Sequence, residues 1–268
     1  MGEFLEDIGI SAEKTEAFFA AEGKSIRVFV FEKTASTNTD AKNYAKGNDS
    51  REATLFIAKK QSAGRGRLGK SFASDFGTGL YATLLFYPDE NLDITKITPL
   101  AALATAKVLS ALCGLEAKIK WVNDIYVGEK KLAGILTEGE FSENGGLKFA
   151  AVGFGINLYK TPFGDELSQI ATDLETEGYI PPSREELAAK ISLELLRLIE
   201  KGDTGAALSE YRERSCLTGA RVSVLSLGEE KFSAKVLGIG ESFELLLLLD
   251  DGRSVSLSTG EVSVKKID

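Results

Sequence analysis

The apolar positions of this chain change their spacing several times, and each spacing predicts a different kind of element. Runs rich in β-branched and aromatic residues predict strands at residues 26–31, 54–58 and after residue 77. The small-residue stretch at 94–114 has the length of a helix and is followed by Gly114. Tight turns at Gly128-Glu129 and Asn144-Gly145-Gly146 join further apolar runs, which predicts an antiparallel meander.

Capping signals place the helices more closely. Thr37 and Asp40 have the spacing of a capping box at the start of a polar helix. Ser183 and Glu186 have the same spacing before a strongly amphipathic helix that Gly202 ends. A second helix is predicted over about residues 204–214.

The last fifty residues change character. Short β-runs separated by turns at Gly228-Glu229, Gly240-Glu241 and Asp251-Gly252 predict a small SH3-like β-barrel. The fold class is therefore α+β, a mixed and largely antiparallel sheet with helices plus this barrel. We expect a short N-terminal extension over residues 1–26, a main domain over 27–217 and the barrel over 218–268.

Composition removes several function classes. The chain of 268 residues has no histidine, which excludes Ser-His-Asp and Cys-His catalysis and most zinc sites. Two cysteines do not make a disulfide framework. The net charge of -8 disfavours a broad surface for DNA, and the apolar runs are too short to span a membrane. With no secretory signal at the acidic N-terminus, we expect a cytoplasmic protein.

The most informative loop is GRGRLGKS at residues 64–71, which fits the Walker A pattern of nucleotide-binding P-loops. A P-loop needs a helix straight after it, and this alternative predicts one starting at Gly69. A β-run follows instead, and the Walker B lookalike at 244–251 reads as a hairpin turn. The loop is basic on an acidic protein, which indicates a pocket for a small anion, although incidental surface arginines are an alternative.

Five motifs follow one another along the chain. They are STN at 36–38, QSAGRGRLGKSF at 61–72, KWVNDIYV at 120–127, KLAGIL at 131–136 and VGFGIN at 152–157. Their order and spacing resemble those of biotin protein ligases, also called biotin–[acetyl-CoA-carboxylase] ligases, and GEVS at 260–263 matches the end of that family's small barrel. The resemblance covers about residues 27–268 and implies the class II synthetase-like catalytic fold.

The resemblance implies two half-reactions. The carboxylate of biotin attacks the α-phosphate of ATP to give biotinyl-5'-adenylate, and a lysine of a biotin carboxyl carrier domain then attacks the mixed anhydride. Mg²⁺ would offset the charge of the triphosphate. Positioned cations are the main resource for such chemistry, since losing one donor typically costs on the order of 10²–10³ in rate.

The resemblance also assigns residues. Lys131 and Arg67 are the expected catalytic residues, and Lys120 and Asp124 serve the second step or the metal. The expected biotin-binding residues are Ser36, Thr37, Asn38, Gln61, Gly64, Arg65, Arg67, Lys131, Gly134 and Gly153. The expected nucleotide-binding residues are Arg65, Gly66, Arg67, Lys70, Phe72, Asn123 and Asn157.

Simpler explanations compete with these roles. Lys131 could be an exposed lysine after a turn, and Ser36 and Thr37 could cap a helix. Gly134 and Gly153 could mark strand bulges. Lys120 and Asp124 could form a structural ion pair. Trp121 is most simply a core residue.

The sequence departs from the family pattern at three positions, where Val122 replaces a proline, Phe72 a tryptophan and Lys70 an arginine. Lys70 keeps the charge but loses bidentate geometry. Val122 and Phe72 leave open a non-catalytic biotin-binding module.

Lipoate or octanoate transfer on the same fold is a second alternative, although that family's histidine-containing motif is missing. The N-terminal extension does not resemble the DNA-binding domain of bifunctional family members, so we expect no repressor activity. A homodimer through sheet edges remains open.

Overall fold

The computed structural model describes residues 9–75, 77–89, 92–141, 146–226, 229–258 and 262–267. Several predicted features lie wholly or partly outside these residues. They are the apolar positions Phe4, Leu5 and Ile8, the turns at Asn144-Gly145 and Gly228, and the start of the GEVS motif.

The larger of two sheets has seven strands in the order β1-β2-β3-β7-β6-β5-β4. β1 and β2 are parallel, and every other neighbouring pair is antiparallel, which confirms the predicted mixed and largely antiparallel sheet. The strands are β1 (Arg27–Phe31), β2 (Thr54–Ala58), β3 (Gly79–Phe86), β4 (Lys118–Lys120), β5 (Asp124–Val127), β6 (Lys130–Phe141) and β7 (Leu147–Asn157).

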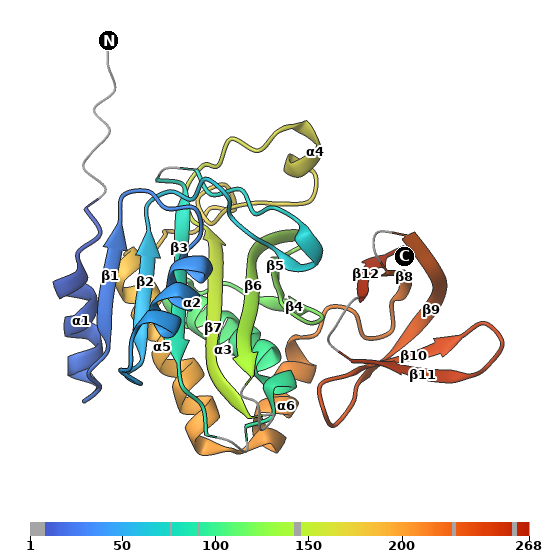
Figure 1. Ribbon diagram of the computed structural model, residues 1–268. Coiled ribbons are helices and arrows are strands. Elements are labelled where there is room, and N and C mark those ends of the chain that lie inside the picture. Colours follow the sequence, from blue (N-terminus) through green and yellow to red (C-terminus); the bar gives the residue numbers. More distant parts are fainter. Residues whose placement is uncertain are drawn as a thin grey trace, which may run out of the picture.

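Helices cover both faces of this sheet (Figure 1). Along β2, Phe56 packs in a small aromatic cluster with α2 (Thr37–Gly47), whereas Leu55 and Ile57 belong to the main core. The main core includes α3 (Ile94–Cys113) and α5 (Arg184–Lys201), which lie behind the sheet in Figure 1. This alternation is what a strand buried on both faces requires. The remaining helices are α1 (Ala12–Ala21), α4 (Asp165–Ser168) and α6 (Thr204–Arg214).

The helix α3 is long and apolar enough to cross a membrane by length and composition alone. Most of that window is buried, and α3 packs against α5 and β6. It is therefore the central core helix of this fold.

Most predicted helix ends are confirmed. Gly114 and Gly202 end α3 and α5 in the left-handed conformation, and the Ser183 side chain accepts from Glu186 N at 3.1 Å. The capping box predicted at Thr37 and Asp40 is wrong. Thr37 is the first helical residue, and Asp40 instead accepts a hydrogen bond from Thr34 Oγ1 at 2.6 Å.

A second, five-stranded antiparallel sheet has the order β11-β10-β9-β8-β12. Its strands are β8 (Arg221–Ser226), β9 (Glu229–Ile239), β10 (Leu245–Leu249), β11 (Ser254–Leu257) and β12 (Val262–Lys266). Among the described residues β11 and β12 do not pair, so a closed barrel is not seen. Trp121 Nε1 donates to Phe243 O at 2.8 Å and thereby joins the two sheets. Trp121 is buried, as predicted for a core residue.

Candidate active site

One cavity gathers most of the predicted site residues. It lies between the start of α2, the basic loop after β2, and the strands β5, β6 and β7. The predicted residues that line it are Ser36, Thr37, Asn38, Gln61, Arg65, Gly66, Arg67, Lys70, Phe72, Asn123, Asp124, Lys131, Gly134 and Gly153.

The basic loop is a short hairpin, which we call the lid (residues 64–72). Phe72 N donates to Gly64 O at 2.9 Å, and Gly66 N donates to Lys70 O at 2.7 Å. Leu68 and Gly69 have positive φ values of 57° and 73° at the tip. A single 3₁₀ turn spans Arg67–Gly69, and the described residues from 70 to β3 contain no helix. The P-loop alternative is therefore wrong, because a P-loop cradles phosphate at a helix N-terminus.

At one end of the cavity, Lys131 Nζ lies 2.7 Å from Asp124 Oδ1. The backbone fixes Lys131 from the other side, since its N donates to Ile170 O and its O accepts from Thr172 N, both at 2.9 Å. Lys131 is therefore a partly buried member of a polar cluster, not the exposed lysine of the simpler explanation.

Arg67 reaches the same end of the cavity from the lid. Its Nη1 donates to Asn123 Oδ1 at 3.1 Å, and Asn123 Nδ2 donates to Ile135 O at 2.8 Å. Burial lowers the pKa of Arg67, and the charge of Asp124 opposes that shift. A guanidinium stays protonated even so. With Lys131 and Arg67 beside one carboxylate, this end of the cavity carries surplus positive charge.

Lys120 does not form the ion pair with Asp124 that the simpler explanation proposed. Its Nζ contacts Tyr126 OH at 3.3 Å and lies over the Tyr126 ring, 5.3 Å from the centroid. Burial lowers the pKa of Lys120, with Asp124 opposing. Lys120 lies in the strand next to the cavity but is not part of its lining.

The other end of the cavity is a fixed polar wall. Gln61 Oε1 accepts from Thr37 N at 2.9 Å, and Gln61 Nε2 donates to Ser74 Oγ at 3.0 Å. Asn38 Oδ1 accepts from Thr83 Oγ1 at 2.6 Å. Ser36 occupies the N-cap position of α2 without a side-chain capping bond, so capping does not account for its hydroxyl.

The glycines of this wall are there because side chains pack directly on the strands. A Cβ at Gly153 would overlap Asn38 Oδ1, and one at Gly155 would lie 2.7 Å from the Phe72 ring. Gly134 and Gly153 themselves pair in regular register, and the register shift between β5 and β6 falls between Lys131 and Ala133. The strand-bulge explanation is wrong at both positions.

Two other predicted residues do not line the cavity. Asn157 Nδ2 donates to Thr172 O at 2.9 Å and is buried, so it fastens the end of β7. Gly64 is buried at the base of the lid.

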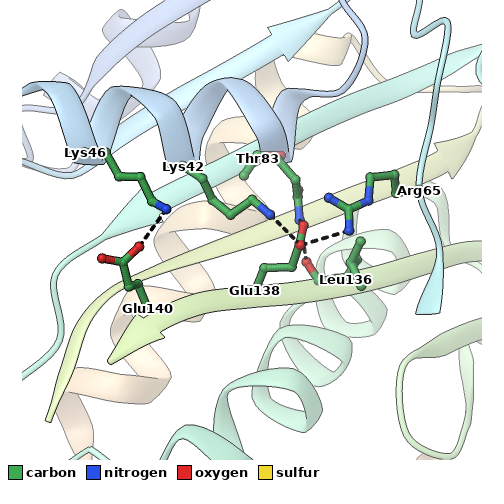
Figure 2. A network of polar contacts seen from close by, with 8 residues as sticks. Lys42, Lys46, Arg65, Thr83, Leu136, Glu138 and Glu140 are labelled. Atoms are coloured by element: carbon green, nitrogen blue, oxygen red, sulfur yellow. Dashed lines mark hydrogen bonds and ion pairs between the residues drawn. The ribbon is translucent and has the colours of Figure 1, made fainter. Parts of the chain in front are cut away.

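Sequence reasoning missed Ser74, Thr83, Gly155 and Glu138. Glu138 receives hydrogen bonds from Asn38 and Lys42 and an ion pair from Arg65 (Figure 2). The available signal was an acidic residue two positions beyond the KLAGIL motif.

The described residues hold no cluster of three or more His, Cys, Asp or Glu side chains that could bind a metal ion. Asp124 is the carboxylate that lines the cavity. A single carboxylate can take part in binding Mg²⁺ if phosphate oxygens and water supply most of the metal's ligands. Proteins commonly bind Mg²⁺ together with a nucleotide in this way.

Comparison with known proteins shows which family has this fold and these motifs. The model of the Biotin/lipoate A/B protein ligase family matches residues 30–157. A biotin–[acetyl-CoA-carboxylase] ligase of Mycobacterium tuberculosis is 30% identical over 246 residues, which cover 87% of each chain. This chain belongs to the biotin/lipoate A/B protein ligase family.

Other members of the biotin/lipoate ligase family agree with this. The bifunctional ligase/repressor BirA of Bacillus subtilis is 40% identical over 143 residues, which are 52% of this chain and 43% of the relative. The alignment thus spans less than half of that relative. The structure of the biotin protein ligase from Aquifex aeolicus in complex with biotin and ATP matches with a TM-score of 0.75 and 27% identity, covering 89% of this chain and 98% of the other. The predicted catalytic fold is confirmed.

Proposed function

We propose that this chain is an ATP-dependent biotin protein ligase. It would activate biotin as biotinyl-5'-adenylate and transfer it to a lysine of a biotin carboxyl carrier domain. The observation that carries the proposal is the cluster of Lys131, Asp124 and Arg67 at one end of a cavity whose other end is a fixed polar wall.

In the first step two anions must meet. An oxygen of the biotin carboxylate bonds to the α-phosphorus of ATP, and the bond from that phosphorus to the bridging oxygen of pyrophosphate breaks. Lys131 and Arg67 would offset the negative charge that gathers on the α-phosphate. Asp124 holds Lys131 in place through their 2.7 Å contact.

In the second step the amine of the carrier lysine attacks the carbonyl carbon of the adenylate, and AMP leaves. The amine must lose a proton before or during attack. Asp124, which lines the cavity, is our first candidate to accept that proton, and Lys120 in the neighbouring strand stays a second candidate for this step.

The polar wall would hold biotin. Ser36, Thr37, Asn38 and Gln61 offer hydroxyl and amide groups to the ureido and carboxylate groups. Gly134 and Gly153 line the same cavity beside the rings, and the missing side chain at Gly153 makes room for Asn38. Lys70, Phe72 and Asn123 would contact the nucleotide. Mg²⁺, held by the phosphates and Asp124, would neutralise part of the triphosphate charge.

The remaining structural expectations belong to the same proposal. They are the SH3-like barrel, the domain limits at 26 and 217, a cytoplasmic location and the homodimer through sheet edges.

Mass spectrometry of a carrier domain tests the proposed function. Incubation with the chain, biotin, ATP and Mg²⁺ should add one biotin to the carrier lysine, and omission of ATP should prevent it. Lack of modification with all components present contradicts the proposal.

Calorimetry with biotin and with lipoate separates the two branches of the family. Tight binding of lipoate alone would favour lipoate transfer.

A further inference from the structure

Glu138 of β6 lies beside the cavity but has no role in the chemistry above. Its Oε1 is 2.6 Å from Lys42 Nζ and 3.2 Å from Arg65 Nη2, and its Oε2 accepts from Asn38 Nδ2 at 3.0 Å. Figure 2 shows Lys42 from α2 and Arg65 from the lid converging on the Glu138 carboxylate. Only 18% of the Glu138 side chain is exposed.

The contact with Arg65 joins two elements that border the cavity. Arg65 belongs to the lid between β2 and β3, whereas Glu138 follows Leu136 along the β6 wall. Both Arg65 and Leu136 line the cavity. An ion pair between these two positions therefore ties the lid to β6.

The Glu138 carboxylate is charged and held in a fixed position for its ion pair with Arg65. Burial raises the pKa of Glu138, but the hydrogen bonds from Lys42 and Asn38 together with the charges of Lys42 and Arg65 outweigh this, so its pKa lies below the ordinary value. The carboxylate is therefore charged at neutral pH. Lys42 and Asn38 hold it in place from α2 whether or not Arg65 is present.

The two lid arginines face different ends of the cavity. Arg67 bonds to Asn123 next to Asp124, at the end where Lys131 lies. Arg65 reaches Glu138 beside Asn38, at the end assigned to biotin, and half of its side chain is exposed. One loop thus supplies a cation to each end.

We propose that Glu138 is a positioning residue that holds the lid over bound biotin through Arg65, while Arg67 serves the reacting groups. This inference rests on the proposed function, because the bound molecule is biotin. Loss of the tie should shorten the lifetime of bound biotin, since the lid would open more often.

A double-mutant cycle with Glu138→Gln and Arg65→Met tests the tie, with biotin affinity measured by calorimetry and biotin release by stopped flow. Each single variant should weaken binding by about ten-fold, mainly through faster release. The double variant should bind about as tightly as Arg65→Met alone. In steady-state assays Glu138→Gln should raise the KM for biotin much more than it lowers kcat.

Glu140→Gln is the matched control. Glu140 pairs with Lys46 one turn further along α2, at 2.8 Å, and Arg65 does not contact it (Figure 2). The biotin affinity of the Glu140→Gln variant should stay within about two-fold of that of the unaltered chain, because a partly exposed ion pair such as Glu140–Lys46 contributes little. If Glu138→Gln fails to fold, Glu138→Asp replaces it, because aspartate keeps the charge on a shorter side chain. Its effect on biotin affinity should also be non-additive with that of Arg65→Met.

Additive effects of the two substitutions, or equal effects of Glu138→Gln and Glu140→Gln, would overturn the inference. If the unaltered chain fails to bind biotin at all, the proposed function falls and this inference falls with it. If the unaltered chain binds biotin but shows no coupling, only the role of Glu138 is refuted.

Discussion

Among single residues, the proposed activity depends on the side chains that reach the reacting groups. Lys131 and Asp124 are 2.7 Å apart at the positively charged end of the cavity, and Arg67 completes that end through Asn123. These residues come from β5, β6 and the lid, so the fold and not the local sequence brings them together.

Lys131→Met should lower biotin-dependent adenylate formation by on the order of 10²–10³, because a positioned cation is lost from the developing charge. Biotin binding should survive in large part, since the polar wall is untouched. Pyrophosphate release and calorimetry measure the two quantities. Lys130→Met is the control, because Lys130 lies outside the cavity lining and its Nζ donates to Ser168 O at 3.1 Å, so this variant should keep nearly full activity. Equal losses in both variants would contradict the assignment.

Gly153→Ala should destabilise the chain by about 1–3 kcal/mol, because the added methyl group overlaps Asn38 Oδ1. Biotin affinity should fall as Asn38 is displaced. Urea unfolding and calorimetry give both effects. At Gly47, near the end of α2, nothing lies within 4 Å of an added Cβ, and Gly47→Ala should be neutral or stabilising by up to about 1 kcal/mol. A Gly153 variant as stable as the unaltered chain would be at odds with this packing.

Sequence reasoning found the residues that stand in ordered motifs and missed those defined only by three-dimensional contacts. Lys131 and Arg67 were predicted because the motifs around them are specific. Glu138 was missed because an acidic residue in a strand is usually solvent-facing, and only the position of Lys42 on α2 shows that it is paired. Asn157 was assigned to the nucleotide, but its amide bonds to Thr172 O.

At the scale of elements, the lid decides between two classes of protein. The Walker A pattern is met by the letters of residues 64–71, yet the chain forms a hairpin with positive φ at Leu68 and Gly69 and then continues toward β3. The sequence predicted this correctly, because a β-run and not an amphipathic helix follows Lys70. The capping box predicted at Thr37 and Asp40 is wrong because α2 begins one residue earlier than that pattern requires. Ser36 occupies the N-cap position, and Thr37 is already the first helical residue. The backbone N of Thr37 donates to Gln61, and its hydroxyl lies 2.8 Å from that of Thr83.

Lys70→Met separates a lid from a P-loop. In a P-loop the lysine inside the motif is essential for phosphate binding. Here Lys70 is exposed at the end of a hairpin, so its loss should lower kcat/KM for ATP by about ten-fold or less, the effect of a surface charge contact. Lys131→Met should lose far more in the same assay. A collapse of activity in Lys70→Met comparable with that of Lys131→Met would refute the lid.

At the scale of the whole molecule, the two sheets are joined next to the active site. Trp121 donates to Phe243 O, and Tyr211 OH donates to Val122 O at 3.1 Å while its ring packs against Phe243. Asn123, which holds Arg67, is the next residue in the chain. The sequence identified both sheets, but no pattern within either sheet predicts which residues join them.

Trp121→Phe should lower the free energy of unfolding by about 1–3 kcal/mol, because the buried Phe243 carbonyl loses its donor. Circular dichroism is the suitable probe in urea titrations, since the chain has a single tryptophan and the variant has none. Unchanged stability would mean that this bond does not hold the sheets together.

The central claim is that the cavity activates biotin with ATP. Exchange of labelled pyrophosphate into ATP tests it most directly, because the assay needs no carrier domain and reports formation of the adenylate alone. We predict exchange that requires both biotin and Mg²⁺ and that Lys131→Met lowers by on the order of 10²–10³. Exchange without biotin would contradict activation of biotin by this cavity. Absence of exchange under conditions in which calorimetry shows that biotin is bound would contradict it too.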